Sequence, residues 1–216
     1  MKILSLECTA GPASAAITED GRVIASSFVN VKLTHSQTLL PMAEGLFAAA
    51  RLGLSDIDGI AVTAGPGSFT GVRIGICAAN AMAAAFGKPV AAASSLEGLL
   101  YGIDNACALL DCRNGNGYAM VKYEGFSPEP MAVVIDDLLS TLPRGILMAG
   151  DGAVMHRERI LTALPNARFA EDNDIIADKI GLAAYDKLVR GETVIEALPL
   201  YLRPSQAERL AKERNK

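Results

Sequence analysis

The hydrophobic positions of this chain alternate between short apolar runs and longer segments with helical spacing. Three short runs, joined by Gly-Pro and Asp-Gly turns, predict strands at Ile3–Leu6, Ala13–Ile17 and Val23–Phe28. Thr34–Arg51 then places apolar side chains at helical spacing and predicts an amphipathic helix. Strands followed by alternating helices and strands are typical of an α/β lobe.

Residues 60–75, Ile-Ala-Val-Thr-Ala-Gly-Pro-Gly-Ser-Phe-Thr-Gly-Val-Arg-Ile-Gly, are the most informative stretch. Ile60–Thr63 predicts a buried strand, the Gly65-Pro66-Gly67 run breaks it, and Ser68 or Thr70 can cap a helix that reaches about Phe86. Backbone N–H groups at such a helix start can hold an anion. The spacing fits neither common phosphate loop, so both an anion cradle and a simple strand-to-helix turn stay open.

The same order of elements recurs in the second half. Ala106–Asp111 and Tyr118–Tyr123 flank an Asn-Gly-Asn-Gly turn and predict a hairpin. The other predicted elements are a strand at Val90–Ala93, a helix from Ser94 to about Tyr101, a strand at Pro128–Val134, a helix at Asp136–Thr141, a strand at Gly145–Ala149, and helices at Ala153–Leu164 and Ile175–Arg190. We expect an N-terminal lobe over 1–103, a C-terminal lobe over 104–200 and a C-terminal tail over 201–216.

Composition narrows the class of protein. A net charge of −4 and a hydrophobic content of 50% over 216 residues describe a soluble globular protein and argue against a nucleic-acid-binding surface on this chain alone. The cysteines, Cys8, Cys77, Cys107 and Cys112, lack metal-site spacing, and we expect buried, reduced thiols. The longest apolar stretch, Ile74–Phe86, is shorter than a membrane span, so we expect a cytoplasmic protein.

Acidic residues supply the main candidate chemistry. Glu7 and Asp111 end strands and Asp151 lies between two glycines, where carboxylates of a two-lobed nucleotide-binding protein can hold hydrated Mg²⁺. Each can equally bond the backbone of its own turn. The candidate nucleotide-binding set is Glu7, Gly65, Gly67, Ser68, Asp111 and Asp151. A metal site joining the two histidines, His35 and His156, is not expected, and Ser68 lacks the second glycine of a nucleophile elbow.

Several motifs together carry a family resemblance. They are His35-Ser-Gln-Thr-Leu-Leu-Pro41, Ala64-Gly-Pro-Gly-Ser-Phe-Thr-Gly-Val-Arg-Ile-Gly75, Leu110-Asp-Cys-Arg113, Ala149-Gly-Asp-Gly-Ala153 and Tyr201-Leu-Arg203. The chain resembles the bacterial accessory subunit of tRNA threonylcarbamoyladenosine biosynthesis, an inactive paralogue of the threonylcarbamoyl transferase. This implies two lobes of actin-like and sugar-kinase-like (ribonuclease H-like) plan, each a mixed sheet flanked by helices.

The resemblance also implies a non-catalytic role. In the catalytic relative, a helix after the strand matching Val90–Ala93 carries two metal-binding histidines four residues apart, whereas Ser94–Leu100 has none here. The first motif, Leu6-Glu-Cys-Thr9, also departs from the family's Asp-Thr-Ser run, which puts nucleotide coordination there in doubt. We expect no required cofactor and at most weak binding of ATP or ADP.

The partners follow from the same resemblance. The helices matching 35–51 and 71–86 pair with equivalent helices of the transferase, or with a second copy when the protein is alone, and the complex recruits an ATPase subunit. The chain's own small-residue helix agrees, because a helix apolar all round must be covered on more than one side. The expected partner-binding residues are Leu39, Met42, Leu46, Val72, Ile76, Ala79 and Ala83.

Two alternatives belong to other classes of function. An independent small-molecule kinase of the same fold would place Glu7, Asp111 and Asp151 around Mg-ATP and would turn over ATP. A metal-dependent peptidase would carry bound zinc or iron.

Overall fold

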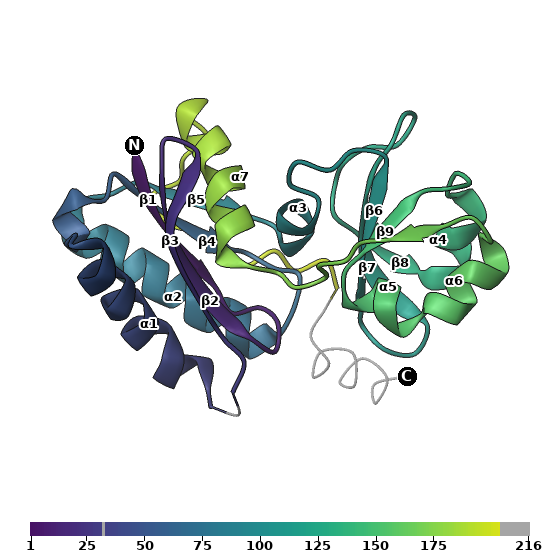
Figure 1. Cartoon of the computed structure of the whole chain (residues 1–216), viewed down its shortest axis with the longest axis horizontal. Helices are drawn as coiled ribbons and strands as arrows, with labels where there is room; N and C mark the ends of the chain where they lie inside the picture. The colour runs from purple at the N-terminus through teal and green to yellow at the C-terminus, as the bar shows by residue number, and fades with distance from the viewer. Residues whose placement is uncertain (32, 204–216) are drawn as a thin grey trace, which may run out of the picture.

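The computed structural model describes residues 1–31 and 33–203, which form two five-stranded mixed sheets (Figure 1). The first sheet has the order β3-β2-β1-β4-β5, with β1 at Lys2–Glu7, β2 at Ala13–Glu19, β3 at Arg22–Val29, β4 at Gly59–Thr63 and β5 at Val90–Ala93. The second has the order β10-β9-β6-β7-β8, with β6 at Ala106–Asp111, β7 at Asn116–Lys122, β8 at Met131–Val134, β9 at Leu147–Ala149 and β10 at Arg168–Phe169. The expected two-lobe plan is confirmed.

Helices cover both faces of the first sheet. On one face, α1 (His35–Ala50) and α2 (Phe69–Phe86) pack against the sheet in one apolar core, and a short 3-10 helix, η1 (Leu54–Asp56), precedes β4. On the other face, α7 (Ala177–Val189) contacts β1, β2, β4 and β5. The expected C-terminal lobe over 104–200 is therefore wrong for α7, because the chain returns to the first sheet after β10.

The second sheet is flanked by α4 (Ile135–Thr141), α5 (Asp151–Met155) and α6 (Arg157–Ala163). The single helix expected at Ala153–Leu164 is wrong, because the chain breaks at His156, whose φ is −101° and ψ is 20°. The hairpin of β6 and β7 is confirmed, with β7 beginning at Asn116. The sequence patterns predicted neither β10 nor η1.

A continuous apolar core joins the lobes. The short helix α3 (Ser95–Leu99) lies between them (Figure 1), and its Leu96 and Leu99 pack in one cluster with residues of both sheets. Ile3 and Ala61 belong to the first sheet and Ala108 to the second. This shared core holds the two lobes together beside α3.

Two glycines bring the start of α2 against the end of β1. A Cβ atom on Gly71 would lie 1.9 Å from the Cys8 carbonyl oxygen, and one on Gly67 would lie 2.5 Å from the Thr9 oxygen. Ser68 N donates to the same Thr9 oxygen at 2.7 Å, and Ser68 Oγ accepts from Gly71 N, which caps the helix. The glycine-rich turn therefore sets how closely α2 approaches β1.

Candidate functional site

The main candidate site is a cavity of about 580 Å³ between the lobes, which is within the size range of small-molecule sites. Its walls come from the β1–β2 turn, the start of α2, the end of β6 and α5. The lining residues are Thr9, Ala10, Gly67, Ser68, Phe69, Leu110, Asp111, Cys112, Arg113, Tyr118, Asp151, Met155 and Ile175. Four of the predicted nucleotide-binding residues therefore meet at one cavity, namely Gly67, Ser68, Asp111 and Asp151.

Glu7 and Gly65, which the sequence placed in the same set, are both buried and do not line the cavity. Glu7 Oε1 accepts from the Thr9 amide and from the Thr9 hydroxyl, each at 2.6 Å. The Thr9 hydroxyl also contacts Ser95 Oγ at 3.1 Å, and Ser95 Oγ donates to the Pro66 oxygen at 2.7 Å. The carboxyl thus bonds the backbone of its own turn, so the interpretation as a cavity ligand is wrong.

Burial changes the acidity of the Glu7 side chain. Desolvation raises the pKa of its carboxyl, and the nearby Thr63 and Thr9 hydroxyls only partly oppose this. Among the described residues, neither Glu7 Oε2 nor Thr63 Oγ1 has a hydrogen-bond partner of good geometry. Glu7 therefore acts as a buried hydrogen-bond acceptor for Thr9, whose own carbonyl oxygen accepts from Ser68 N in the glycine-rich turn.

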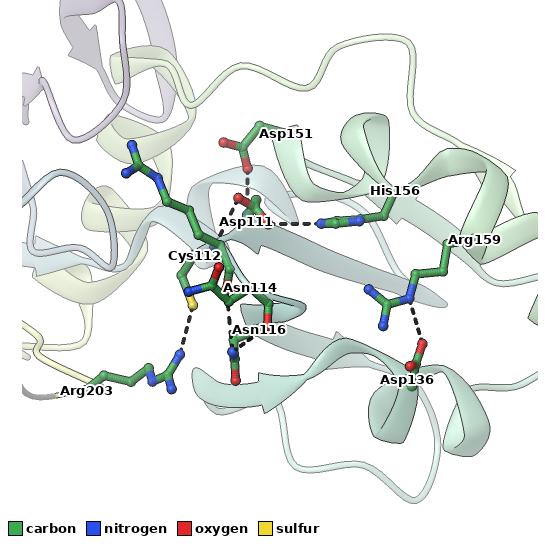
Figure 2. A network of polar contacts seen from close by, with 10 residues as sticks. Asp111, Cys112, Asn114, Asn116, Asp136, Asp151, His156, Arg159 and Arg203 are labelled. Carbon is green, nitrogen blue, oxygen red and sulfur yellow. Dashed lines mark hydrogen bonds and ion pairs between the residues drawn. The ribbon is translucent and has the colours of Figure 1, made fainter. Parts of the chain in front are cut away.

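The other acids are tied to each other and to a histidine (Figure 2). Asp111 Oδ1 lies 2.9 Å from His156 Nε2, and Asp111 Oδ2 accepts from Arg113 N at 3.1 Å. Asp151 Oδ1 accepts from Asp111 N, also at 3.1 Å. Desolvation raises the pKa of the Asp151 carboxyl, although the residue as a whole is exposed.

These contacts do not bring together the three carboxylates that the sequence grouped around Mg²⁺. Glu7 is outside the cavity, and both oxygens of Asp111 already have partners. In residues 1–31 and 33–203, no group of three or more His, Cys, Asp or Glu is placed to hold a metal ion.

The sequence patterns did not link His156 to Asp111, because the two residues lie 45 positions apart and no motif joins them. His35 behaves as a structural residue, since its Nε2 lies 3.1 Å from the Ala10 oxygen. That contact ties the start of α1 to the cavity wall.

The cysteines are free but not all buried. Cys8 and Cys107 are buried, as expected, and desolvation raises the pKa of each thiol to about 12. Cys77 is exposed, which corrects the expectation, because it lies on the solvent side of α2. Cys112 is partly exposed in the cavity wall, where its Sγ accepts from Arg203 Nη1 at 3.2 Å (Figure 2).

The seven predicted partner-binding residues are buried against the chain's own sheet. Leu39, Met42, Leu46, Val72, Ile76, Ala79 and Ala83 all belong to the core of the first lobe. Their choice as contact residues is wrong, because the apolar stripe of each helix is the side that the sheet already covers. The solvent side of α2 carries Thr70, Arg73, Cys77, Ala81 and Ala84, and that of α1 carries Leu40, Glu44 and Ala48.

The solvent side of α2 carries mostly small side chains, and Arg73 is its one charged residue. The helix has 18 residues with a mean hydropathy of 1.4, which by length and composition is enough to cross a membrane, yet only 33% of it is buried. Its contacts with β4, β1 and β5 are those of a core helix of a globular lobe. An apolar helix that leaves one side exposed to solvent is unusual in a protein that acts alone.

Comparisons with known proteins place the chain among tRNA-modification proteins. The family model described as TsaD, tRNA N6-adenosine threonylcarbamoyltransferase, matches residues 29–143. The chain belongs to this family. A transferase of the family from Geotalea uraniireducens is 34% identical over 45% of this chain and 33% of its own length.

Two other relatives match over nearly the whole chain. The tRNA threonylcarbamoyladenosine biosynthesis protein TsaB of Bacillus subtilis is 28% identical over 96% of each chain. The solved structure of YeaZ from Pseudomonas aeruginosa superposes with a TM-score of 0.78 and 29% identity, over 93% of this chain and 99% of that one. The predicted resemblance to the accessory subunit of tRNA threonylcarbamoyladenosine biosynthesis is confirmed.

Proposed function

We propose that this chain is a non-catalytic accessory subunit of the machinery that forms N6-threonylcarbamoyladenosine in tRNA, and that it binds and activates the threonylcarbamoyl transferase. The full-length likeness to a protein named for this pathway supports the proposal, whereas the named transferase matches only part of the chain. The chain would act in the complex by ordering its partner.

The observation that carries the partner binding is the uncovered face of α2. Thr70, Cys77, Ala81 and Ala84 are exposed at spacings of seven, four and three residues, so they share one side of the helix. Arg73 on the same side is engaged by Tyr201, and the other side chains are small and uncharged, so another helix can approach them closely with little desolvation cost. We infer that helices of the transferase cover this face, that a second copy covers it when the protein is alone, and that an ATPase subunit joins the assembled complex.

The non-catalytic part of the proposal rests on the chain's own side chains. Ser94–Leu100 carries no histidine, and the two histidines present are engaged by the Ala10 carbonyl and by Asp111. The proposed subunit requires no cofactor. Weak binding of ATP or ADP stays a prediction for the cavity walls formed by Gly67, Ser68, Asp111 and Asp151, and calorimetric titration of the isolated chain with each nucleotide tests it.

Nucleoside analysis of cellular tRNA tests the role directly. In cells from which the gene has been deleted, or depleted if it is essential, mass spectrometry of digested tRNA is expected to show at least a tenfold loss of threonylcarbamoyladenosine. A plasmid copy of the wild-type gene restores it. Unchanged modification in cells that lack the protein contradicts the proposed function.

A further inference from the structure

The segment 194–203, which we name the C-terminal strap, runs alongside α2 and is held there by its backbone. Val194 and Val90 exchange two hydrogen bonds, of 2.9 and 3.3 Å, which extends the edge of the first sheet. The Asn80 side chain of α2 bonds both the amide and the carbonyl of Ala197, at 2.9 and 3.0 Å. Leu200 N donates to the Ala64 oxygen at 2.8 Å.

The end of the strap is held by side chains. Tyr201 stacks on Phe69 with ring centroids 5.2 Å apart, and its hydroxyl accepts from Arg73 Nε at 2.9 Å. The strap is therefore fixed at both ends and in its middle, although it contains no helix and only one bridge.

Two large aliphatic side chains of this anchored segment face solvent. Ile195 is 99% exposed and Leu198 is 71% exposed, whereas Ala197 between them is buried. The only charged residue from Val194 to Leu202 is Glu196. A fixed backbone that presents exposed aliphatic side chains is typical of a protein-binding surface rather than of a solvated loop.

The strap is continuous with the uncovered face of α2. Asn80, which holds Ala197, lies on the same helix next to Ala81 and one turn from Cys77 and Ala84, so a protein seated on that face reaches the strap. A stable interface buries about 800 Å² on each partner. Alanine and cysteine side chains allow close approach but supply little area, so larger anchors must come from beside the helix.

We propose that Ile195 and Leu198 are anchor residues for the transferase, and that each enters an apolar depression on that partner's surface. This inference rests on the proposed function and adds a contact outside helices α1 and α2. The partner surface opposite the strap is uncharged, because a charge facing these aliphatic side chains would be desolvated without compensation.

Calorimetric titration of the full chain with the purified transferase of the same organism tests the proposal. The double variant Ile195→Ser/Leu198→Ser is expected to keep the wild-type melting temperature, because both side chains are exposed, and to bind at least tenfold more weakly. The control Val134→Ser/Val154→Ser removes two exposed aliphatic side chains of the second lobe and is expected to bind as wild type. The variant Ala81→Glu tests the α2 face separately.

The outcomes separate this inference from the proposed function. If Ala81→Glu abolishes binding and the strap variant binds within twofold of wild type, the strap inference is overturned and the function stands. If the wild-type chain itself does not bind the transferase, the proposed function fails. Light scattering measures self-association of the same variants. If the strap variant weakens self-association and leaves transferase binding unchanged, the occupant is a second copy and the inference is again overturned.

Discussion

His156 Nε2 lies 2.9 Å from Asp111 Oδ1, and this contact joins the break between α5 and α6 to the end of β6. Both side chains are mostly buried, at 18% and 12% exposed. The pair therefore holds one wall of the inter-lobe cavity in place, and it lies where a segment with helical spacing is divided into two helices.

Removal of the imidazole is expected to destabilise the second lobe. His156→Ala leaves Asp111 Oδ1 without its partner, and we expect a loss of about 2 kcal/mol in the free energy of unfolding. Urea unfolding measures it. The control Arg159→Ala breaks the exposed ion pair with Asp136 and is expected to cost less than about 1 kcal/mol. Equal losses in the two variants would contradict the structural role of His156.

Glu7 predicts a dependence of stability on pH. Because burial raises the pKa of its carboxyl above the ordinary value of 4.5, the folded chain keeps the proton to a higher pH than the unfolded chain. The stability from this group is present below about pH 4.5 and is lost as the pH rises through the folded pKa. Glu7→Gln has no such proton, so its stability relative to wild type is expected to increase from pH 4 to pH 8. Urea unfolding at a series of pH values checks this, and a pH-independent difference would show that folding does not raise the pKa of the Glu7 carboxyl.

Two glycines of the helices are expected to respond oppositely to alanine. In Gly71→Ala the new Cβ would lie 1.9 Å from the Cys8 oxygen, so α2 must shift, at a cost of about 1–3 kcal/mol. Gly45→Ala meets nothing within 4 Å in the interior of α1 and is expected to stabilise by about 0.5–1 kcal/mol. Thermal unfolding of both variants checks the signs, and a tolerated Gly71→Ala would contradict the close contact with β1.

Two alanines of α2 separate folding from binding. Ala79 is fully buried, so Ala79→Glu places an unpaired charge in the core and is expected to cost at least about 3 kcal/mol. Ala81 is exposed, and Ala81→Glu is expected to change the free energy of unfolding by less than about 0.5 kcal/mol. Circular dichroism with urea titration distinguishes them, and a strongly destabilised Ala81→Glu would mean that this side of α2 is already packed.

The sequence predicted most of the fold because its local signals agree. β5 at Val90–Ala93 and β6 at Ala106–Asp111 have the predicted bounds, since short apolar runs between turns leave little ambiguity. The return of α7 to the first sheet was missed, because element order says nothing about which sheet a late helix covers. The division at His156 was missed because a tertiary contact accompanies it.

The site was less predictable than the fold, because it depends on tertiary contacts that local sequence patterns do not show. Periodicity identified the apolar stripes of α1 and α2, but it could not show that the chain's own sheet covers them, as it covers Leu39 and Val72. The face left for a partner is the opposite one, which carries smaller side chains. The strand-end rule placed Asp111 correctly at the cavity and failed for Glu7, whose carboxyl bonds the backbone two residues on. Side-chain direction decides such cases, and it depends on contacts that the sequence does not show.

The central claim is that the chain activates the transferase through the solvent face of α2, and a reconstituted reaction tests it most directly. The measurement is the initial rate of threonylcarbamoyladenosine formation on purified tRNA by the complete set of purified components, with the wild-type chain, with Ala81→Glu, or without it. The account predicts at least a tenfold higher rate with the wild-type chain than without it, and a rate with folded Ala81→Glu near that without the chain. Equal rates with the wild-type chain and with Ala81→Glu would contradict it.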